Sequence, residues 1–137
     1  MNTYIVDACA LIAYLKNEPG SNKIVELLKA NASKQIVLYL HHVNLYEVYY
    51  DFYKSDSKEI ADDVLETIYR LPFVFIKDIT TEAMKNAGFF KSSFRVSMAD
   101  SILLGQAKLL NAIVVTADHH EFDIIENNNI CEFFWIR

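Results

Sequence analysis

The chain has 137 residues, which is the size of one domain, and we expect residues 1–137 to fold as a single unit. Apolar residues make up 53% of it and aromatic residues 13%, enough for a hydrophobic core at this size. The net charge of −5 argues against a protein that coats nucleic acid through general positive charge. It does not exclude a nuclease, because clustered carboxylates count as acid in the sum and a bound divalent cation cancels them locally.

No apolar run approaches the ~20 residues that a membrane span needs, and the N-terminus lacks the pattern of a signal peptide. The two cysteines, Cys9 and Cys131, form no CxxC pair and do not suggest a disulfide framework. We therefore expect a cytoplasmic protein that has no contact with a membrane.

Short apolar runs alternate with segments of helical periodicity along the whole chain. The expected strands are residues 2–7, 36–40, 73–76, 112–116 and 132–136. The expected helices are residues 9–16, 20–32, 43–54, 57–69, 80–91, 98–110 and 120–127. This alternation predicts an α/β fold with a central five-stranded parallel sheet and helices on both faces. Right-handed crossovers then bring the carboxyl ends of all strands to one edge of the sheet.

One segment is ambiguous on propensity alone. Residues 41–53 are rich in Tyr and Val, which also suit a strand. The apolar spacing of Leu45, Val48, Tyr49 and Phe52 fits a helix better, and the run is too long for one strand. We therefore predict a helix there.

Four acids fall where a strand has just ended or a helix begins. Asp7 follows the first strand, Glu47 lies in the first turns of the helix after the second strand, Asp100 lies in the first turn of helix 98–110, and Asp118 follows the fourth strand. The topology returns all four to the same edge of the sheet. Carboxylate oxygens are hard ligands that suit Mg²⁺ or Mn²⁺, and a cation would remove their mutual repulsion.

Each acid also has an explanation as a helix cap. Ser97 to Asp100 and Asn44 to Glu47 both have the spacing of a capping box, and Asp7 and Asp118 can be N-caps, the latter with Glu121 at its third position. Asp7 and Glu47 have apolar residues on both sides, whereas a cap usually lies in a polar loop. This context favours a shared site over four separate caps.

The segments that carry these acids resemble PIN-domain proteins over essentially the whole chain. They are IVDACALIAYL around Asp7, NLYE ending at Glu47, SMADSILLGQAKLLNAIVVTAD with Asp100 and Asp118, and EF at Glu121-Phe122. The chain is most similar to the small VapC-like ribonuclease toxins of toxin–antitoxin pairs. The resemblance implies a PIN-like (Rossmann-like) α/β sandwich, RNA cleavage with Mg²⁺ or Mn²⁺ to 5′-phosphate and 3′-hydroxyl ends, a homodimer, and inhibition by a cognate antitoxin.

The resemblance also assigns site positions. It places Asp7, Glu47, Asp100 and Asp118 at the four acidic positions of the family, where they would be both catalytic and metal-binding. Thr116 matches the small hydroxyl residue before the last acid, and Asn44 matches the polar residue three before the glutamate. Cys9 departs from the pattern, because the family often has Ser or Thr there and a thiol is a weaker donor. Asp123 is an additional nearby acid, which a surface position on its helix explains as well as a supporting role does.

Other side chains have two interpretations each. His41-His42 and His119-His120 are expected to be solvated or core residues, with a ligand or proton-donor role as the alternative, chiefly for the second pair. Four tyrosines on one helix are expected to be core and ordinary surface, with a dimer or antitoxin surface as the alternative: Tyr46, Tyr49, Tyr50 and Tyr53. Basic side chains before Asp100 are expected to be solvated, with RNA phosphate contact as the alternative: Lys85, Lys91 and Arg95.

Two other functions remain open from the sequence. One is a catalytically silent protein-binding module that keeps the PIN fold, against which the full set of four acids argues. The other is a different metal-dependent phosphohydrolase, such as a haloacid-dehalogenase-like phosphatase. That chemistry needs a second aspartate two residues after the first, where this chain has Cys9.

Overall fold

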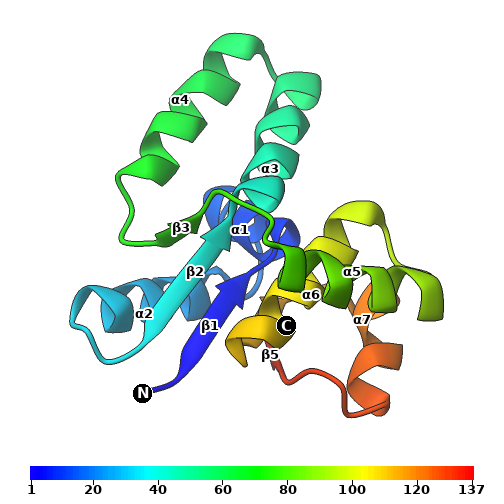
Figure 1. Ribbon diagram of the computed structural model, residues 1–137. Helices are drawn as coiled ribbons and strands as arrows, with labels where there is room; N and C mark the ends of the chain where they lie inside the picture. Colours follow the sequence, from blue (N-terminus) through cyan, green and yellow to red (C-terminus); the bar gives the residue numbers. More distant parts are fainter.

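A computed structural model describes residues 1–137 and contains one sheet of five parallel strands (Figure 1). The strands are β1 (Thr3–Val6), β2 (Val37–His41), β3 (Val74–Ile76), β4 (Ile113–Thr116) and β5 (Phe133–Trp135). The helices are α1 (Ala8–Leu15), α2 (Ser21–Ala32), α3 (His42–Ser55), α4 (Lys58–Tyr69), α5 (Thr81–Ser93), α6 (Met98–Leu110) and α7 (His119–Asn127). The expected parallel α/β fold is confirmed.

The strand order is β3-β2-β1-β4-β5, so the chain builds the sheet outward from β1 in one direction and then in the other. The order therefore reverses between β1 and β4. In an open parallel sheet, the loops that leave the carboxyl ends of the two strands at such a reversal go to opposite faces and leave a crevice between them. We call the edge formed by the carboxyl ends of the strands the carboxyl rim. Asp7 and Asp118 lie at this reversal.

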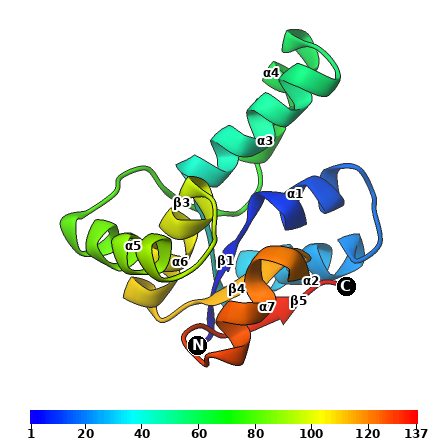
Figure 2. The ribbon, with the colours of Figure 1, turned by 90° about the vertical axis from the view of Figure 1, so that its right-hand side faces the viewer.

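The strands separate two hydrophobic cores, and neighbouring residues point to opposite faces as a pleated strand requires. In β1, Val6 packs with the core formed by α1, α2, α3 and α4, whereas Ile5 packs with the core formed by α5, α6 and α7. Val115 and Val114 of β4 divide in the same way. Figure 2 shows the resulting layers, with α1 and α2 on one side of the sheet and α5 and α6 on the other.

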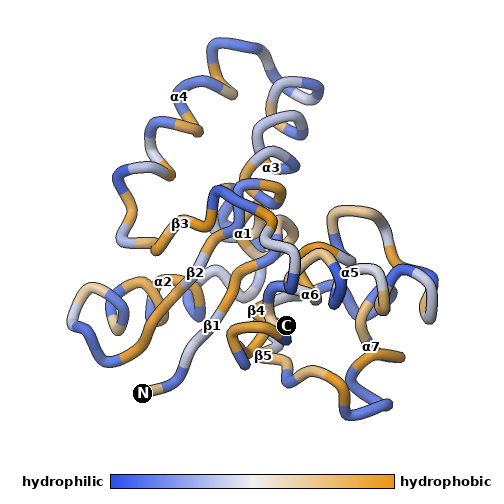
Figure 3. Tube along the Cα trace, in the orientation of Figure 1, coloured by the Kyte–Doolittle hydropathy of each residue, from blue (hydrophilic) through white to orange (hydrophobic).

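The α3–α4 hairpin rises above the carboxyl rim (Figures 1 and 2). The two helices are held together near the rim by buried Ile68, and farther out by buried Ala61 and by the Tyr49 hydroxyl, which donates to Asp62 Oδ1 at 2.7 Å. The hydropathy of the chain falls from the apolar strands toward the turn between these helices (Figure 3). No helix combines the length and apolar character that a membrane crossing requires.

The structure corrects the expected start of α3. The helix begins at His42, directly after β2, and its N-cap is His41, whose Nδ1 accepts from Val43 N at 3.0 Å. Asn44 and Glu47 are therefore inside the helix, and the interpretation of Asn44 as a capping residue is wrong. Their side chains meet on one face of α3, because residues three apart on a helix are neighbours. Elsewhere the expected boundaries are within about two residues of those observed, as for α5, which extends to Ser93.

Helices α5 and α6 pack unusually close together because Gly105 has no side chain. A Cβ atom at this position would lie 2.5 Å from Ala87 N and 2.7 Å from Ala83 O, both backbone atoms of α5. The Asn86 amide donates to the Gly105 carbonyl at 3.3 Å and bridges the same contact. The position of α6, which carries Asp100, depends on this contact.

We predict that Gly105→Ala lowers the free energy of unfolding by about 1–3 kcal/mol, because the added methyl group forces two backbones apart. Gly88→Ala is the matched control, since Gly88 is exposed on α5 and its Cβ would meet nothing within 4 Å. That change should raise stability by about 0.5–1 kcal/mol, because alanine is the better helix former. Urea unfolding measures both, and equal effects of the two substitutions would contradict this account of α5–α6 packing.

Candidate active site

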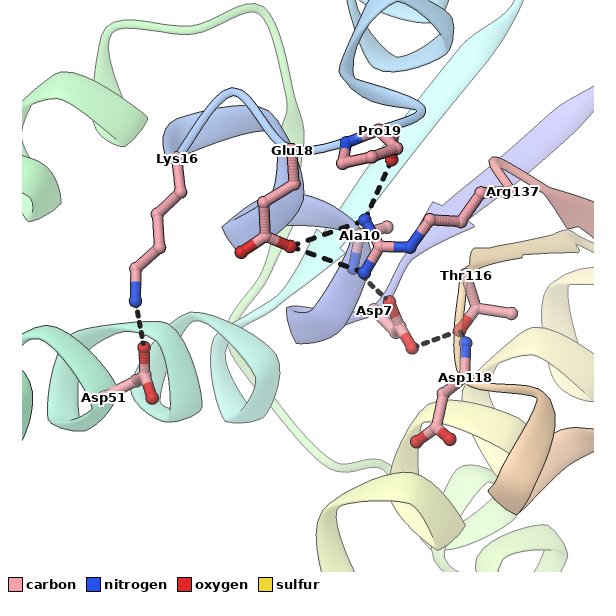
Figure 4. Close-up of polar contacts among 9 residues, drawn as sticks. All are labelled: Asp7, Ala10, Lys16, Glu18, Pro19, Asp51, Thr116, Asp118 and Arg137. Atoms are coloured by element: carbon pink, nitrogen blue, oxygen red, sulfur yellow. Dashed lines mark hydrogen bonds and ion pairs between the residues drawn. The ribbon is translucent and has the colours of Figure 1, made fainter.

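Asp7 lies at the centre of the carboxyl rim and is fixed by its own backbone and by both carboxylate oxygens. It is 3% exposed, and its backbone N donates to Val115 O at 3.1 Å, which extends the pairing of β1 with β4. Its Oδ1 accepts from Ala10 N at 2.7 Å and so caps α1. Its Oδ2 accepts from the Thr116 hydroxyl at 2.5 Å (Figure 4). The carboxylate therefore has one defined orientation.

Thr116 extends this arrangement to the next acid. The Thr116 hydroxyl oxygen, fully buried at the end of β4, accepts from Asp118 N at 2.9 Å while its proton goes to Asp7. Asp118 is the N-cap of α7, and its Oδ1 accepts from Glu121 N at 3.2 Å. The hydroxyl thus connects the two central strand ends and orders both acids that follow them.

Asp100 and Glu47 reach the same region from two helices. Asp100 lies in the first turn of α6, where its backbone N donates to the capping Ser97 Oγ at 3.1 Å. Glu47 lies on α3, and its Oε1 accepts from Asn44 Nδ2 at 3.1 Å. Both carboxylates are half-buried, and α3 packs against α6.

Burial raises the pKa of three of these acids, and repulsion between carboxylates adds to the shift in two of them. Burial raises the pKa of Asp7 to about 7, the hydrogen bonds from Thr116 and Ala10 oppose that shift, and the charges of Asp100 and Asp118 add to it. Burial also raises the pKa of Asp100 to about 7, with further contributions from the charges of Glu47, Glu121 and Asp118 against the opposing hydrogen bond of Ser97. Burial raises the pKa of Glu47, and the hydrogen bond from Asn44 opposes this. The five acids therefore act on one another; we call them the carboxylate cluster: Asp7, Glu47, Asp100, Asp118 and Glu121.

Glu121 is the member of the cluster that sequence reasoning missed as a site residue. Its position three residues after Asp118 identified it only as a capping partner. The signal that could have found it is the helix start itself, because residues at the first turn of α7 point back toward the strand ends from which the helix begins. The carboxylate is half-buried beside Asp100 rather than pointing fully to solvent.

Of the other side chains predicted to be near the site, Cys9 lies beside the cluster, whereas Asp123 and His119 have partners elsewhere. Cys9 is half-buried beside it, and burial together with the charges of Asp7 and Asp118 raises the pKa of its thiol to about 11, so the thiol stays neutral. The Asp123 carboxylate instead lies exposed and pairs with His119 Nδ1 at 2.8 Å. The His119 ring stacks on Trp135 with centroids 3.8 Å apart.

Two further histidines and two of the basic residues also have partners within the protein: His41, His42, Lys85 and Lys91. His41 is buried as the cap of α3, and His42 Nε2 lies 3.1 Å from the Tyr69 hydroxyl. Lys91 Nζ donates to Val96 O at 2.7 Å and so fixes the loop before α6. Lys85 Nζ lies 4.0 Å from Glu82 Oε1 on the same helix. The contacts of His41 and His42 agree with a role in the fold, and Lys85 is solvated as expected, whereas Lys91 also contacts the backbone of its own chain.

The donor chemistry of the cluster fits a hard divalent cation. All its side-chain donors are carboxylate oxygens, and their mutual repulsion is the electrostatic condition that a cation relieves. In addition, Asn44 Oδ1 is buried beside Glu47 without a hydrogen-bond partner in the protein. No three acidic, histidine or cysteine side chains converge closely enough to hold an ion as they stand. The site is therefore a cluster of acidic side chains rather than a closed ligand cage.

The fold and this site define an α/β protein with a cluster of carboxylates at the carboxyl ends of a parallel sheet. The family model described as PIN domain matches residues 4–127. The chain therefore belongs to the PIN-domain family. A comparison with curated protein sequences found no match.

Solved structures share the fold over their full length. The chain is similar to the structure of VapBC2 from Rickettsia felis bound to a promoter DNA fragment, with 20% identity, coverage of 96% of this chain and 97% of that chain, and a TM-score of 0.75. It is also similar to DNA-bound VapBC from Salmonella typhimurium, with 17% identity, full coverage of both chains and a TM-score of 0.75. VapBC-1 from nontypeable Haemophilus influenzae has 16% identity, 98% coverage of both chains and a TM-score of 0.71.

The raised pKa values predict how stability depends on pH in the presence of chelator. Asp7 titrates near 3.8 when unfolded and near 7 when folded, so between these values the folded state keeps a proton that the unfolded state has released. Raising the pH through this window therefore favours unfolding, by at most about 1.4 kcal/mol per pH unit for each such group. Asp7→Asn removes one group and should reduce the fall in stability between pH 5 and pH 8.

Urea unfolding at the two pH values in chelator measures this effect. Asp63→Asn is the control, because Asp63 is exposed on α4, away from the carboxyl rim, and it should show the same pH dependence as the wild type. A wild-type pH dependence in Asp7→Asn would contradict the assignment of this titration to Asp7.

Proposed function

We propose that the protein is an Mg²⁺- or Mn²⁺-dependent endoribonuclease and the toxin of a toxin–antitoxin pair. The observation that carries this proposal is the carboxylate cluster at the reversal of strand order, where burial and neighbouring charges raise the pKa values of Asp7 and Asp100 to about 7. A cluster with this charge attracts a divalent cation and, through it, a phosphodiester. Membership of the PIN-domain family and the VapBC structures that share the fold support the same function.

Asp7, Glu47, Asp100 and Asp118 would hold the cation, with Glu121 beside them. When bound, the cation supplies a Lewis acid that neutralises phosphate charge and makes a water molecule more acidic. The chain itself orients the ligands: Thr116 fixes Asp7, and Asn44 fixes Glu47. Cys9 stays a neutral thiol beside them and adds no charge to the carboxylate cluster.

Hydrolysis adds the oxygen of water to phosphorus and breaks the bond to the 3′ oxygen, which leaves 5′-phosphate and 3′-hydroxyl ends. No histidine is needed as the nucleophile's base in this scheme, in keeping with the structural contacts of His41 and His119. Asp123 has at most a supporting role on this proposal, because its carboxylate is engaged by His119.

We predict that the purified protein cuts single-stranded RNA in Mg²⁺ or Mn²⁺ and stops in chelator. Asp7→Asn and Asp100→Asn should each lower the rate of cleavage more than about 100-fold, since changes even behind the ligands of metal sites cost 10- to 100-fold. Asp63→Asn should keep the wild-type rate. Gel analysis of end-labelled RNA measures the rate and identifies the product ends, and circular dichroism confirms that each variant is folded.

The outcome separates the alternatives. Undiminished cutting in chelator would contradict the metal mechanism. Cation binding without any hydrolysis would favour a silent binding module. Turnover of a small phosphate ester in preference to RNA would favour a different phosphohydrolase.

The proposal includes two protein partners, a second copy of the chain and a cognate antitoxin. The VapBC complexes that share the fold support the antitoxin. We assign an apolar groove of about 410 Å³ between α5 and α6 to the contact with the second copy, in which the same surface of both copies would meet. Its wall includes the exposed side chains of Ile79, Met84 and Met98. Such a contiguous apolar surface is typical of a protein–protein contact.

We predict that the protein alone has the mass of two copies in light scattering, and that Met98→Asp reduces it to one by placing a charge in the groove. Lys29→Asp, a charge change at an exposed position of α2, is the control and should leave the dimer intact.

Co-expression with the protein encoded by the adjacent reading frame should give a stable complex that no longer cuts RNA. A monomeric wild type would contradict the homodimer, and cutting by the complex would contradict the antitoxin.

A further inference from the structure

Two tyrosines project from α3 beside the carboxylate cluster. Tyr46 is 63% exposed and Tyr50 is 47% exposed, and their ring centroids are 5.3 Å apart in an edge-to-face arrangement. They lie four residues apart, so they share one face of the helix. We call them the tyrosine pair. Each exposed ring has a flat apolar face and a polar hydroxyl edge, which is suited to a planar ligand.

The tyrosine pair is next to the acids in sequence and in space. Tyr46 precedes Glu47, and Tyr50 follows it by one helical turn. The charges of Glu47 and of Asp100 on α6 both contribute to a raised pKa of Tyr50, behind the larger effect of burial. Helix α3 also packs against α6, the helix that carries Asp100.

The other two tyrosines of α3 are placed differently. The Tyr49 hydroxyl donates to Asp62 on α4 and so connects the two helices of the hairpin. Tyr53 is 49% exposed but lies one turn nearer the tip, where its ring contacts Tyr49 at a centroid distance of 5.9 Å. Among the four tyrosines, only Tyr46 and Tyr50 are both exposed and within one helical turn of Glu47.

Charge supplies little attraction for a nucleic acid at this rim. The chain carries a net charge of −5, and the Nζ of Lys16, the residue that caps the C-terminus of α1, lies 3.4 Å from Asp51 Oδ2. Lys91 is occupied by the carbonyl of Val96. A polyanion that reaches the cluster therefore needs contacts that do not depend on net charge. Stacking of unpaired bases on aromatic side chains is such a contact, and it tolerates any base sequence.

We propose that Tyr46 and Tyr50 are a stacking surface for unpaired bases of the RNA next to the cleaved phosphate. This inference rests on the proposed ribonuclease function and specifies its substrate as single-stranded RNA or a loop. Bases in a duplex are already stacked on one another and cannot lie on the pair. The pair positions the substrate and takes no part in bond cleavage.

The test measures binding separately from cleavage. A fluorescently labelled single-stranded RNA is titrated with protein in Ca²⁺, and gel analysis verifies that it stays intact. Tyr46→Leu and Tyr50→Leu should each weaken binding roughly 10-fold, because leucine keeps an apolar side chain but removes the stacking face. Tyr50→Phe should stay within about 2-fold of the wild type, and Tyr53→Leu, of matched exposure on the same helix, should bind normally.

Cleavage kinetics give a second measurement. In Mg²⁺ or Mn²⁺ the two leucine variants should raise KM with kcat near the wild-type value, because they remove binding and not chemistry. Wild-type protein should bind duplex RNA more weakly than single strands, and the leucine substitutions should not change duplex binding. Melting curves verify that all variants are folded.

Different results would overturn different claims. Metal-dependent cleavage with normal binding by both leucine variants would contradict the stacking surface and leave the proposed function intact. Tyrosine-dependent RNA binding without hydrolysis would contradict the proposed function and leave the stacking surface intact. Loss of antitoxin binding in the leucine variants, with RNA binding unchanged, would identify the pair as a protein contact. Equal weakening by Tyr53→Leu, or no RNA binding by the wild type, would also reject the proposal.

Discussion

The hydroxyl of Thr116 joins the ends of the two central strands, and the arrangement of the site depends on it. It donates to Asp7 after β1 and accepts from the backbone of Asp118 after β4. One buried side chain therefore orders two acids that are more than a hundred residues apart in sequence. A hydroxyl suits this position because it donates and accepts at once, and a residue that does only one of these would leave a buried group unpaired.

Two acids of the carboxylate cluster also support the fold. Asp7 caps α1 and Asp118 caps α7, yet both carry charge that acts on the rest of the cluster. A cap needs one carboxylate oxygen, and the second oxygen remains for another partner. For Asp7 that partner is Thr116. The sequence presents a helix cap and a site residue as alternatives, but Asp7 and Asp118 are both at once.

The secondary structure could be predicted closely because hydrophobic periodicity reports it directly. The helix over residues 42–55 was recognised by its apolar spacing despite its content of Tyr and Val, and the topology then required the acids to meet at one rim. What could not be predicted depends on where a helix begins. Because α3 begins at His42, Asn44 lies inside the helix rather than at its cap. Glu121 lies in the first turn of α7, where its charge acts on Asp100. The degree of burial, which determines the pKa of Asp7, also follows only from packing of both cores.

The absence of a linker between β2 and α3 has a consequence for how this chain can vary. His41 ends the strand and caps the helix, so the number of residues from the sheet to Glu47 sets the direction of that side chain. Each residue of an α-helix turns it by about 100°, and one inserted residue would therefore point Glu47, Tyr46 and Tyr50 away from the rim together. Chain length is restricted here as strictly as residue type. The turn between α3 and α4 should tolerate inserted residues, because it lies beyond Glu47 and Tyr50 on α3.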